Sequence, residues 1–263
     1  YSSYTRQACN FVFPTIGSKI TGEDRPRPGK FRIKDTDANL IDEAKNSEQT
    51  KVLKRSKEEV QEYVKATTQY INVFIDYLKD LNIKDKENKH TLQNDVEDFY
   101  KKYDGSFTRM LKDDKKKSKV FEALYTSSPK FLYVIFNIFK SKGPVIVYSN
   151  YVAMEGLQIF KIYLNFFGFI AFEDDKDIDV KNLKKKNSKD GFRYIEFHGG
   201  IDKELREANK RIYNMSENKF GDVIKIMMIS PAGAEGISTK NTRQVHIMEP
   251  YWNEVRIEQI IGR

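Results

Sequence analysis

The strongest constraint on this chain is the alternation of short apolar runs with helical segments between residues 120 and 263. Strands are predicted at "PVIVYS" (144–149), "FIAFE" (169–173), "FRYIEF" (192–197), "DVIKIMMIS" (222–230) and "QVHIME" (244–249). Strands that alternate with helices predict a parallel sheet with helices on both of its faces. In such sheets, ligands bind in the loops that follow the carboxyl ends of the strands.

Helices are predicted between these strands and before them. One is expected after Ser128–Pro129, one at 152–166, one from the cap residue Asp202 over "DKELREANKRIYNM", and one opening in "NEVRIEQII". In the N-terminal half, Ser56 and Glu59 have the spacing of a capping box. Apolar residues then recur every three or four positions from Val60 to Leu81, which predicts one long helix with a single apolar face.

The remaining segments suggest a three-part organisation. Residues 1–22 form an apolar, extended segment that leads into the sheet domain. Residues 23–119 are charged, with polar loops predicted at 23–56 and 82–119 on either side of the long helix. A solvated loop is favoured at 82–119, and a phosphate-contacting patch is the alternative. Residues 120–263 are the α/β domain.

Composition sets limits on the partners. The 263 residues carry a formal net charge of +8, from 46 Lys and Arg against 38 Asp and Glu. This excess suits contact with a polyanion such as nucleic acid, and equally suits a merely lysine-rich composition. The single cysteine, Cys9, excludes an internal disulfide and favours a reducing compartment. No apolar run reaches the roughly 20 residues of a membrane span, and no signal peptide is visible. The missing initial Met and the final arginine suggest a piece of a longer protein.

Two of the predicted loops carry phosphate-binding chemistry. After the first strand, Ser149 and Asn150 offer a hydroxyl, an amide and backbone N–H groups, which suit a phosphate but equally suit simple helix capping. After the third strand, His198 precedes two glycines, which let a backbone approach a ligand closely. A tight turn explains the same glycines equally well.

Two further loops combine small and charged residues. In "SPAGAEGIS" (230–238), Glu235 lies among small residues at a strand end, where it can accept a ribose hydroxyl or orient a water or an arginine. Gln259 and Arg263 are four residues apart and share one helical face. An arginine there can stabilise charge on a γ-phosphate held opposite, and the alternative is an ordinary surface arginine.

Together these residues carry a resemblance. The segments "VIVYSNY…GLQIF", "FHGGID", "ISPAGAEGIS" and "EPYWNEVRIEQIIGR" resemble motifs IV, IVa, V and VI of the second RecA-like lobe of superfamily 2 helicases. They are most similar to helicase-like ATPases of large cytoplasmic DNA viruses, such as the poxvirus early transcription factor small subunit and nucleoside triphosphatase I. The resemblance covers residues 1–22 and about 120–263, and leaves 23–119 as a mainly helical, lineage-specific insertion.

The resemblance implies a role for each matching residue. Arg263 is expected to be an arginine finger toward ATP, with Gln259, Gly262, Glu235 and Gly236 near the nucleotide. Nucleic-acid backbone contacts are expected from Ser149, Asn150, His198, Gly199, Ser230 and Gly233. The second arginine of motif VI in the family would follow residue 263, so the arginine pair is incomplete within this sequence.

The sequence lacks two motifs that such enzymes need. It contains neither G-x-x-x-x-G-K-[ST] nor a DExH or DEAD box. The resemblance assigns both to a preceding RecA-like lobe that holds ATP with Mg²⁺, so this chain alone is expected to be inactive. No metal site is expected within the chain itself.

Two functions follow from these observations. The first is the motor lobe of a viral helicase or translocase, acting in the virion and the viral factory of the host cytoplasm, with a viral RNA polymerase as a further partner. The second is a non-enzymatic docking module, in which the insertion 23–119 binds a polymerase or virion factor. A Rossmann-type or flavodoxin-type nucleotide domain is disfavoured because no G-x-G-x-x-G follows the first strand.

Overall fold

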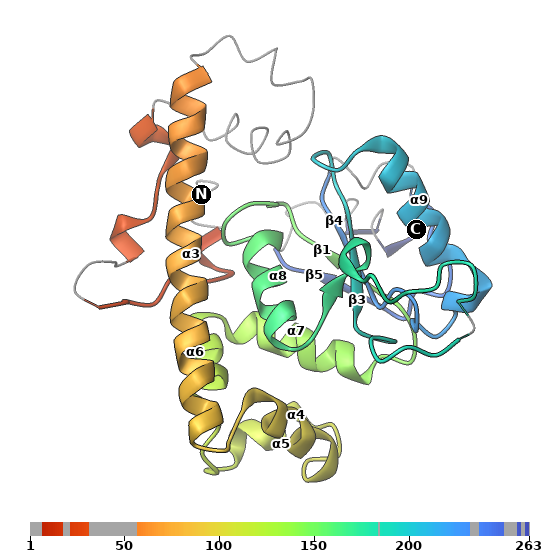
Figure 1. Ribbon diagram of the computed structural model, residues 1–263, viewed down its shortest axis with the longest axis horizontal. Coiled ribbons are helices and arrows are strands. Elements are labelled where there is room, and N and C mark those ends of the chain that lie inside the picture. The colour runs from red at the N-terminus through yellow and green to blue at the C-terminus, as the bar shows by residue number, and fades with distance from the viewer. Residues whose placement is uncertain are drawn as a thin grey trace. The chain divides into compact units, whose positions relative to one another are not determined.

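The computed structural model describes residues 7–17, 22–31, 57–183, 185–231, 237–249, 257–258 and 261–262. These residues form two compact units (Figure 1), of which one ends at Lys140 and the other begins at Ser141. The division of the sequence into 1–22, 23–119 and 120–263 stays a prediction.

The first unit is helical. It contains the 3₁₀ turns η1 (Gly22–Asp24) and η2 (Pro28–Phe31) and the helices α3 (Lys57–Glu87), α4 (Leu92–Lys101), α5 (Phe107–Lys112), α6 (Lys119–Ser127) and α7 (Pro129–Lys140). Helix α3 confirms the predicted long helix, and its buried face includes Tyr63, Thr67, Tyr70, Phe74 and Leu78. Their spacing of three or four residues is the helical period, which explains why this element was visible in the sequence. The expected cap residue Ser56 lies outside the described residues.

Aromatic side chains make up much of the core of this unit. The ring of Phe13 lies 4.6 Å from that of Tyr70, and the rings of Phe107 and Phe136 stack at 4.3 Å. The segment around Phe11 and Phe13 is attached along its backbone as well, because the Val12 N–H donates to the Ser127 carbonyl at 2.9 Å. The apolar N-terminal segment therefore contributes core side chains to the helical unit.

The prediction of a solvated loop at 82–119 was wrong. Helix α3 continues to Glu87, and α4 and α5 follow it. Helices α4 and α5 bury only a few apolar residues each, among them Leu92, Phe99 and Met110, and present charged residues elsewhere. The sparse apolar positions gave too weak a helical period to stand out from the charge, although tertiary packing is enough to stabilise such short helices.

The second unit is an α/β structure. Its elements are β1 (Val145–Tyr148), α8 (Leu157–Phe166), β2 (Ile170–Ala171), η4 (Phe172–Asp174), β3 (Arg193–Phe197), α9 (Lys203–Asn214), η5 (Ser216–Asn218), β4 (Ile226–Ile229) and β5 (Gln244–Ile247). Among the described residues, the strands form one parallel sheet in the order β2-β3-β4-β1-β5. This confirms the predicted fold class, a RecA-like parallel sheet accompanied by a mainly helical part.

Helices α8 and α9 lie on opposite sides of the sheet (Figure 1). The chain passes from β1 to β2 toward one edge of the sheet and from β3 to β4 toward the other. Because crossover connections are right-handed, opposite directions of travel place the two helices on opposite faces. The central strands β1 and β4 are buried along their whole length, as their continuous apolar sequences predict.

Several predicted elements are shorter than expected. Strand β4 begins at Ile226, and β2 has only two residues before η4. Helix α8 begins at Leu157, not at residue 152, whereas α9 begins after Asp202, whose carboxylate accepts hydrogen bonds from the Glu204 and Leu205 N–H groups as predicted. The predicted helix at 253–261 lies mostly outside the described residues.

Candidate functional site

The loops predicted to carry function follow strands that end side by side. Tyr148 is in register with Ile229 on one side and with Ile247 on the other, and Phe197 is also in register with Ile229. The residues after these four strand ends therefore lie along the same edge of the sheet. They include Ser149 after β1, His198 after β3, Ser230 after β4 and Glu249 shortly after β5.

The direction of the connections between strands also changes at this edge. From β1 the chain runs toward one edge strand of the sheet, β2. From the neighbouring strand β4 it runs in the opposite direction, to the other edge strand, β5. Adjacent strands whose connections run in opposite directions leave a crevice at their carboxyl ends, and this is where open α/β sheets bind ligands. The topology therefore selects the Ser149 and Ser230 ends as the centre of the candidate site.

A buried carboxylate organises the loop after β1. Glu249 is 2% exposed, and its two oxygens accept hydrogen bonds from the Ser149 hydroxyl at 2.8 Å and the Asn150 backbone N–H at 2.7 Å. The Asn150 side-chain amide donates to the same carboxylate at 3.3 Å, and the Tyr148 hydroxyl donates to the Asn150 amide oxygen at 3.1 Å. Ser149 is fully buried, so its hydroxyl supports the loop from inside the protein.

The far end of this loop depends on a glycine. A Cβ at Gly156 would lie 2.0 Å from the Tyr151 carbonyl oxygen, so only glycine fits there. The same carbonyl accepts a hydrogen bond from the Leu157 N–H at 3.0 Å, at the start of α8. The loop from Ser149 to Gly156 is thus held by Glu249 at one end and by close backbone packing at the other.

The loop after β3 is supported by a second, partly buried carboxylate. His198 interacts through Nε2 with Glu196 at 2.9 Å, and its Nδ1 accepts a hydrogen bond from the Gly200 N–H at 3.1 Å. Because Nδ1 is an acceptor, the proton of the neutral ring is on Nε2, which donates to Glu196. Lys161 of α8 forms an ion pair with the same carboxylate at 2.7 Å. Burial raises the pKa of Glu196, but the His198 hydrogen bond and the Lys161 charge outweigh it and lower that pKa to about 2.

The predicted site residues after β3 and β4 differ in exposure. His198 is buried, while Gly199 and Gly200 are partly exposed in the turn that follows it. Ser230 is fully buried, and in the part of the chain that the structure describes its hydroxyl has no hydrogen-bond partner. Its position beside β1 nevertheless agrees with the expectation that Ser149 and Ser230 share one edge.

Several predicted residues cannot be placed. Gly233, Glu235, Gly236, Gln259 and Arg263 lie outside the described residues. Gly262 is described and exposed, and its N–H donates to the Glu258 carbonyl at 2.7 Å. The predicted roles of all these residues stay predictions, as do those of Ser149, Asn150, His198, Gly199 and Ser230.

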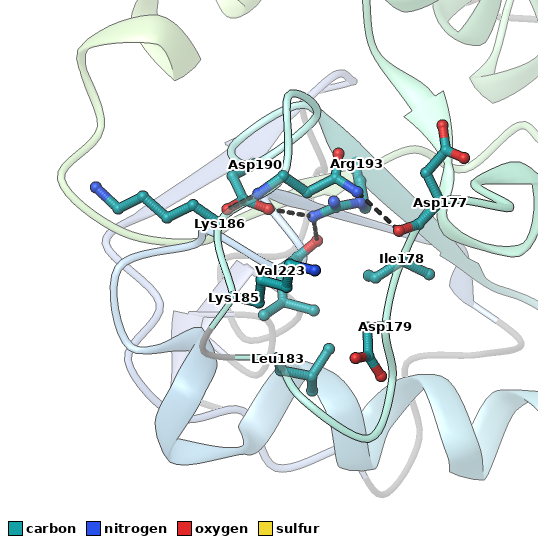
Figure 2. A pocket seen from close by; sticks show the side chains of 10 residues that line it. Asp177, Ile178, Asp179, Leu183, Lys185, Lys186, Asp190, Arg193 and Val223 are labelled. Atoms are coloured by element: carbon teal, nitrogen blue, oxygen red, sulfur yellow. Dashed lines mark hydrogen bonds and ion pairs between the residues drawn. The ribbon is translucent and has the colours of Figure 1, made fainter.

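A separate cavity of about 130 Å³ lies beside the loop between β2 and β3 (Figure 2). Arg193, at the start of β3, borders it and is 1% exposed. Its guanidinium is paired with Asp175 at 2.7 Å and Asp190 at 3.0 Å and also donates to the Asp222 carbonyl at 3.1 Å. Two carboxylates already balance this one charge, so the arrangement is best explained as an anchor for the β2–β3 loop.

Sequence reasoning missed Glu249, Glu196 and Arg193. For Glu249 a weak signal existed, because a carboxylate that ends an apolar strand at a predicted ligand edge is unusual. Its partners, Ser149 and Asn150, are about 100 residues away in the chain. Only the pairing of β1 with β5 brings these groups together.

The described residues do not form a complete nucleotide site. Among them, no group of three or more His, Cys, Asp or Glu side chains is arranged to hold a metal ion. The sequence also has no phosphate loop. No described helix combines the length and apolar character needed to cross a membrane.

A RecA-like sheet with loops of this composition at its switch point defines the second lobe of a helicase-like protein. The comparison with protein families agrees, because the helicase conserved C-terminal domain matches residues 128–263. The chain belongs to this family.

Individual relatives are viral. The chain is 40% identical over 266 residues to a protein of Acanthamoeba polyphaga mimivirus named "putative ATP-dependent RNA helicase", and this alignment covers 100% of the chain and 31% of that protein. It is 32% identical over 182 residues to the termination factor NPH-I homolog of African swine fever virus, covering 58% of the chain and 26% of the relative. It is 29% identical over 145 residues to nucleoside triphosphatase I of Melanoplus sanguinipes entomopoxvirus, covering 55% of the chain and 19% of the relative.

These alignments have two consequences. The chain spans about a third or less of the length of these relatives. The similarity to the mimivirus protein runs along the whole chain, so the region 23–119 has a counterpart there. The resemblance to helicase-like proteins of large DNA viruses is therefore confirmed.

Proposed function

We propose that this chain is the C-terminal motor lobe of a larger, ATP-dependent viral helicase or translocase. The observation that carries the proposal is the family match over 128–263, whose last residues include the Gln259–Arg263 sequence. The relatives named as an ATP-dependent helicase and a nucleoside triphosphatase support nucleotide hydrolysis by the whole protein. The family match favours this function over a non-enzymatic docking module.

In this proposal, the edge formed by β1, β3 and β4 contacts the nucleic-acid backbone. Asn150 and the turn at Gly199 supply donors at the surface, and Ser230 and Gly233 belong to the neighbouring loop. Ser149 and His198 contribute to the same contact by holding these loops, because their polar atoms are engaged within the protein. Contacts of this kind are directed at phosphates and do not read sequence.

The nucleotide side of the proposal rests on the residues of motifs V and VI. Glu235, Gly236 and Gly262 are proposed to border ATP, Gln259 to lie near it, and Arg263 to stabilise negative charge on the γ-phosphate during hydrolysis. ATP and Mg²⁺ would be held mainly by an N-terminal RecA-like lobe, since this sequence lacks a phosphate loop. Catalysis therefore requires both lobes.

The biological setting is proposed from the relatives. One of them is named a termination factor, which supports a role in viral transcription beside a viral RNA polymerase. The relatives belong to cytoplasmic DNA viruses, which supports a location in the virion and in the viral factory of the host cytoplasm.

The test of this function is the change Arg263→Ala in the full-length protein. Arginine fingers contribute roughly 10³–10⁵ in rate, so ATP hydrolysis should fall by about three orders of magnitude or more. The measurement is steady-state phosphate release at saturating ATP and nucleic acid.

The matched control is Arg243→Ala, which removes an exposed arginine at the amino end of β5, away from the candidate edge. It should leave turnover within about twofold, because exposed surface substitutions rarely matter. Near-normal turnover by the Arg263→Ala protein would contradict the assignment.

A further inference from the structure

The conformation of the loop after β1 depends on contacts with a residue outside the loop. Its first two residues are tied to Glu249 by the Ser149 hydroxyl, the Asn150 backbone N–H and the Asn150 side-chain amide. Bonds to an ionised carboxylate are roughly twice as strong as bonds between neutral groups. A buried carboxylate also strongly requires its donors, because an unpaired buried charge is costly. Glu249 therefore holds the loop in this conformation.

The Asn150 amide is oriented by two partners. Its oxygen accepts a hydrogen bond from the Tyr148 hydroxyl, and its nitrogen donates one hydrogen to Glu249. An amide nitrogen carries two hydrogens, so a second donor remains on Asn150, which is only partly buried. That donor suits an acceptor such as a phosphate oxygen.

We propose that Glu249 is a positioning residue for nucleic-acid binding, which acts by fixing Asn150 and does not itself touch the ligand. The proposal rests on the proposed function of this edge. Direct contact is excluded by charge and by burial, since a carboxylate repels phosphate and Glu249 is 2% exposed. The carboxylate improves binding because the loop is already ordered before the nucleic acid arrives.

The first experiment uses the full-length protein with Glu249→Ala, Asn150→Ala and the double variant. ATP turnover is measured against the concentration of single-stranded oligothymidylate and of oligouridylate. Loss of a hydrogen bond to a charged group should raise the half-activating concentration roughly tenfold to a hundredfold. Turnover at saturating oligonucleotide should change by less than about twofold, since the chemistry is untouched.

The double variant separates positioning from a general structural effect. If Glu249 acts through Asn150, the double variant should be no weaker than the weaker of the single variants. Shifts that multiply in the double variant would overturn the proposal. As a matched control, Asp190→Asn alters a carboxylate that pairs with Arg193 beside the other loop, and it should leave the half-activating concentration unchanged.

Amide hydrogen exchange in the same full-length protein tests the anchor without nucleic acid. In Glu249→Ala, the Asn150 amide should exchange at least about tenfold faster, while the amides of β4 keep their protection. If Glu249→Ala fails to fold, Glu249→Gln replaces it, because one acceptor oxygen is kept and a smaller shift of both readouts in the same direction is expected. An unchanged Asn150 amide in the folded variant would overturn the proposal.

Failure of the proposed function and failure of the positioning role give different results. A wild-type protein whose turnover responds to neither oligonucleotide would refute the proposed function, and with it the binding role of Glu249. A wild-type protein that responds, with a Glu249→Ala variant whose half-activating concentration is unchanged, would refute only the positioning role.

Discussion

At the scale of single residues, the candidate edge is shaped by carboxylates that face inward. Glu249 holds the loop after β1, and Glu196 holds the loop after β3 through His198. Glu196 also pairs with Lys161 of helix α8. The same carboxylate therefore contacts both α8 and His198, which precedes the turn at Gly199. The groups that would contact a ligand are held in place by these two carboxylates.

Glu196 should make stability depend on pH at the acid end. Its pKa is lowered from 4.5 to about 2 in the folded protein. A depressed folded pKa means that the ionised group contributes stability above the unfolded pKa. This stability is lost as the pH falls from about 4.5 toward 2, and the full contribution is about 3 kcal/mol. Urea unfolding at a series of acid pH values measures it.

The control for this prediction is Glu196→Gln. The variant should be less stable than wild type at neutral pH, and the difference between the two proteins should shrink as the pH falls. A difference that stays constant from neutral to acid pH would contradict the role given to the ionised Glu196.

At the scale of elements, helix α6 begins on two carboxylates from other helices. Asp85 of α3 accepts hydrogen bonds from the Lys119 N–H at 2.9 Å and the Val120 N–H at 3.0 Å. Asp95 of α4 accepts one from the Ser118 N–H at 2.9 Å. The first N–H groups of a helix have no partner within it, and they attract negative charge. The start of α6 is thus satisfied by tertiary contacts with α3 and α4.

Asp85→Ala should destabilise the helical unit by about 2–4 kcal/mol. The change leaves two N–H groups without acceptors, the partly buried one of Lys119 and the buried one of Val120, and removes a charge that favours the helix start. Hydrogen exchange of the α6 amides, which reports the free energy of opening, measures the loss.

Asp76→Ala provides the matched comparison on the same helix. Asp76 is 73% exposed and forms a surface ion pair with Lys79. Its loss should cost less than about 0.5 kcal/mol. Equal effects of the two substitutions would contradict the capping role of Asp85.

At the scale of the whole molecule, the net charge of +8 acts together with the candidate edge. Neutral donors such as the Asn150 amide set the position and orientation of a bound phosphate backbone, whereas the excess of basic residues attracts a polyanion at long range. Binding that depends on phosphates releases counterions, and its affinity falls as salt rises.

The affinity of the full-length protein for a single-stranded oligonucleotide should therefore fall roughly tenfold or more between about 50 and 200 mM salt. Fluorescence anisotropy of a labelled strand measures this dependence. A second strand with the same composition in scrambled order should bind equally well. Salt-independent binding, or strong preference for one order, would contradict backbone recognition.

Much of the fold could be predicted because its signals are local. The continuous apolar run at β1, the Asp202 cap of α9 and the three-and-four spacing of α3 each depend on neighbours in the sequence. The helices between residues 92 and 112 could not be predicted, because their stability comes from packing of a few residues such as Phe99 and Phe107 against distant helices.

The sequence by itself determined the class of fold and the set of loops that could bind ligands, since the alternation of strands and helices allows few topologies. The tertiary structure alone decided which polar groups in those loops are exposed. The sequence predicted Ser149 and Asn150 equally as contacts to the nucleic-acid backbone. In the structure Ser149 is buried against Glu249, whereas Asn150 is partly exposed. The reason is that a buried carboxylate needs hydrogen-bond donors. The pairing of strands decides which donors lie near it, whatever their distance along the chain.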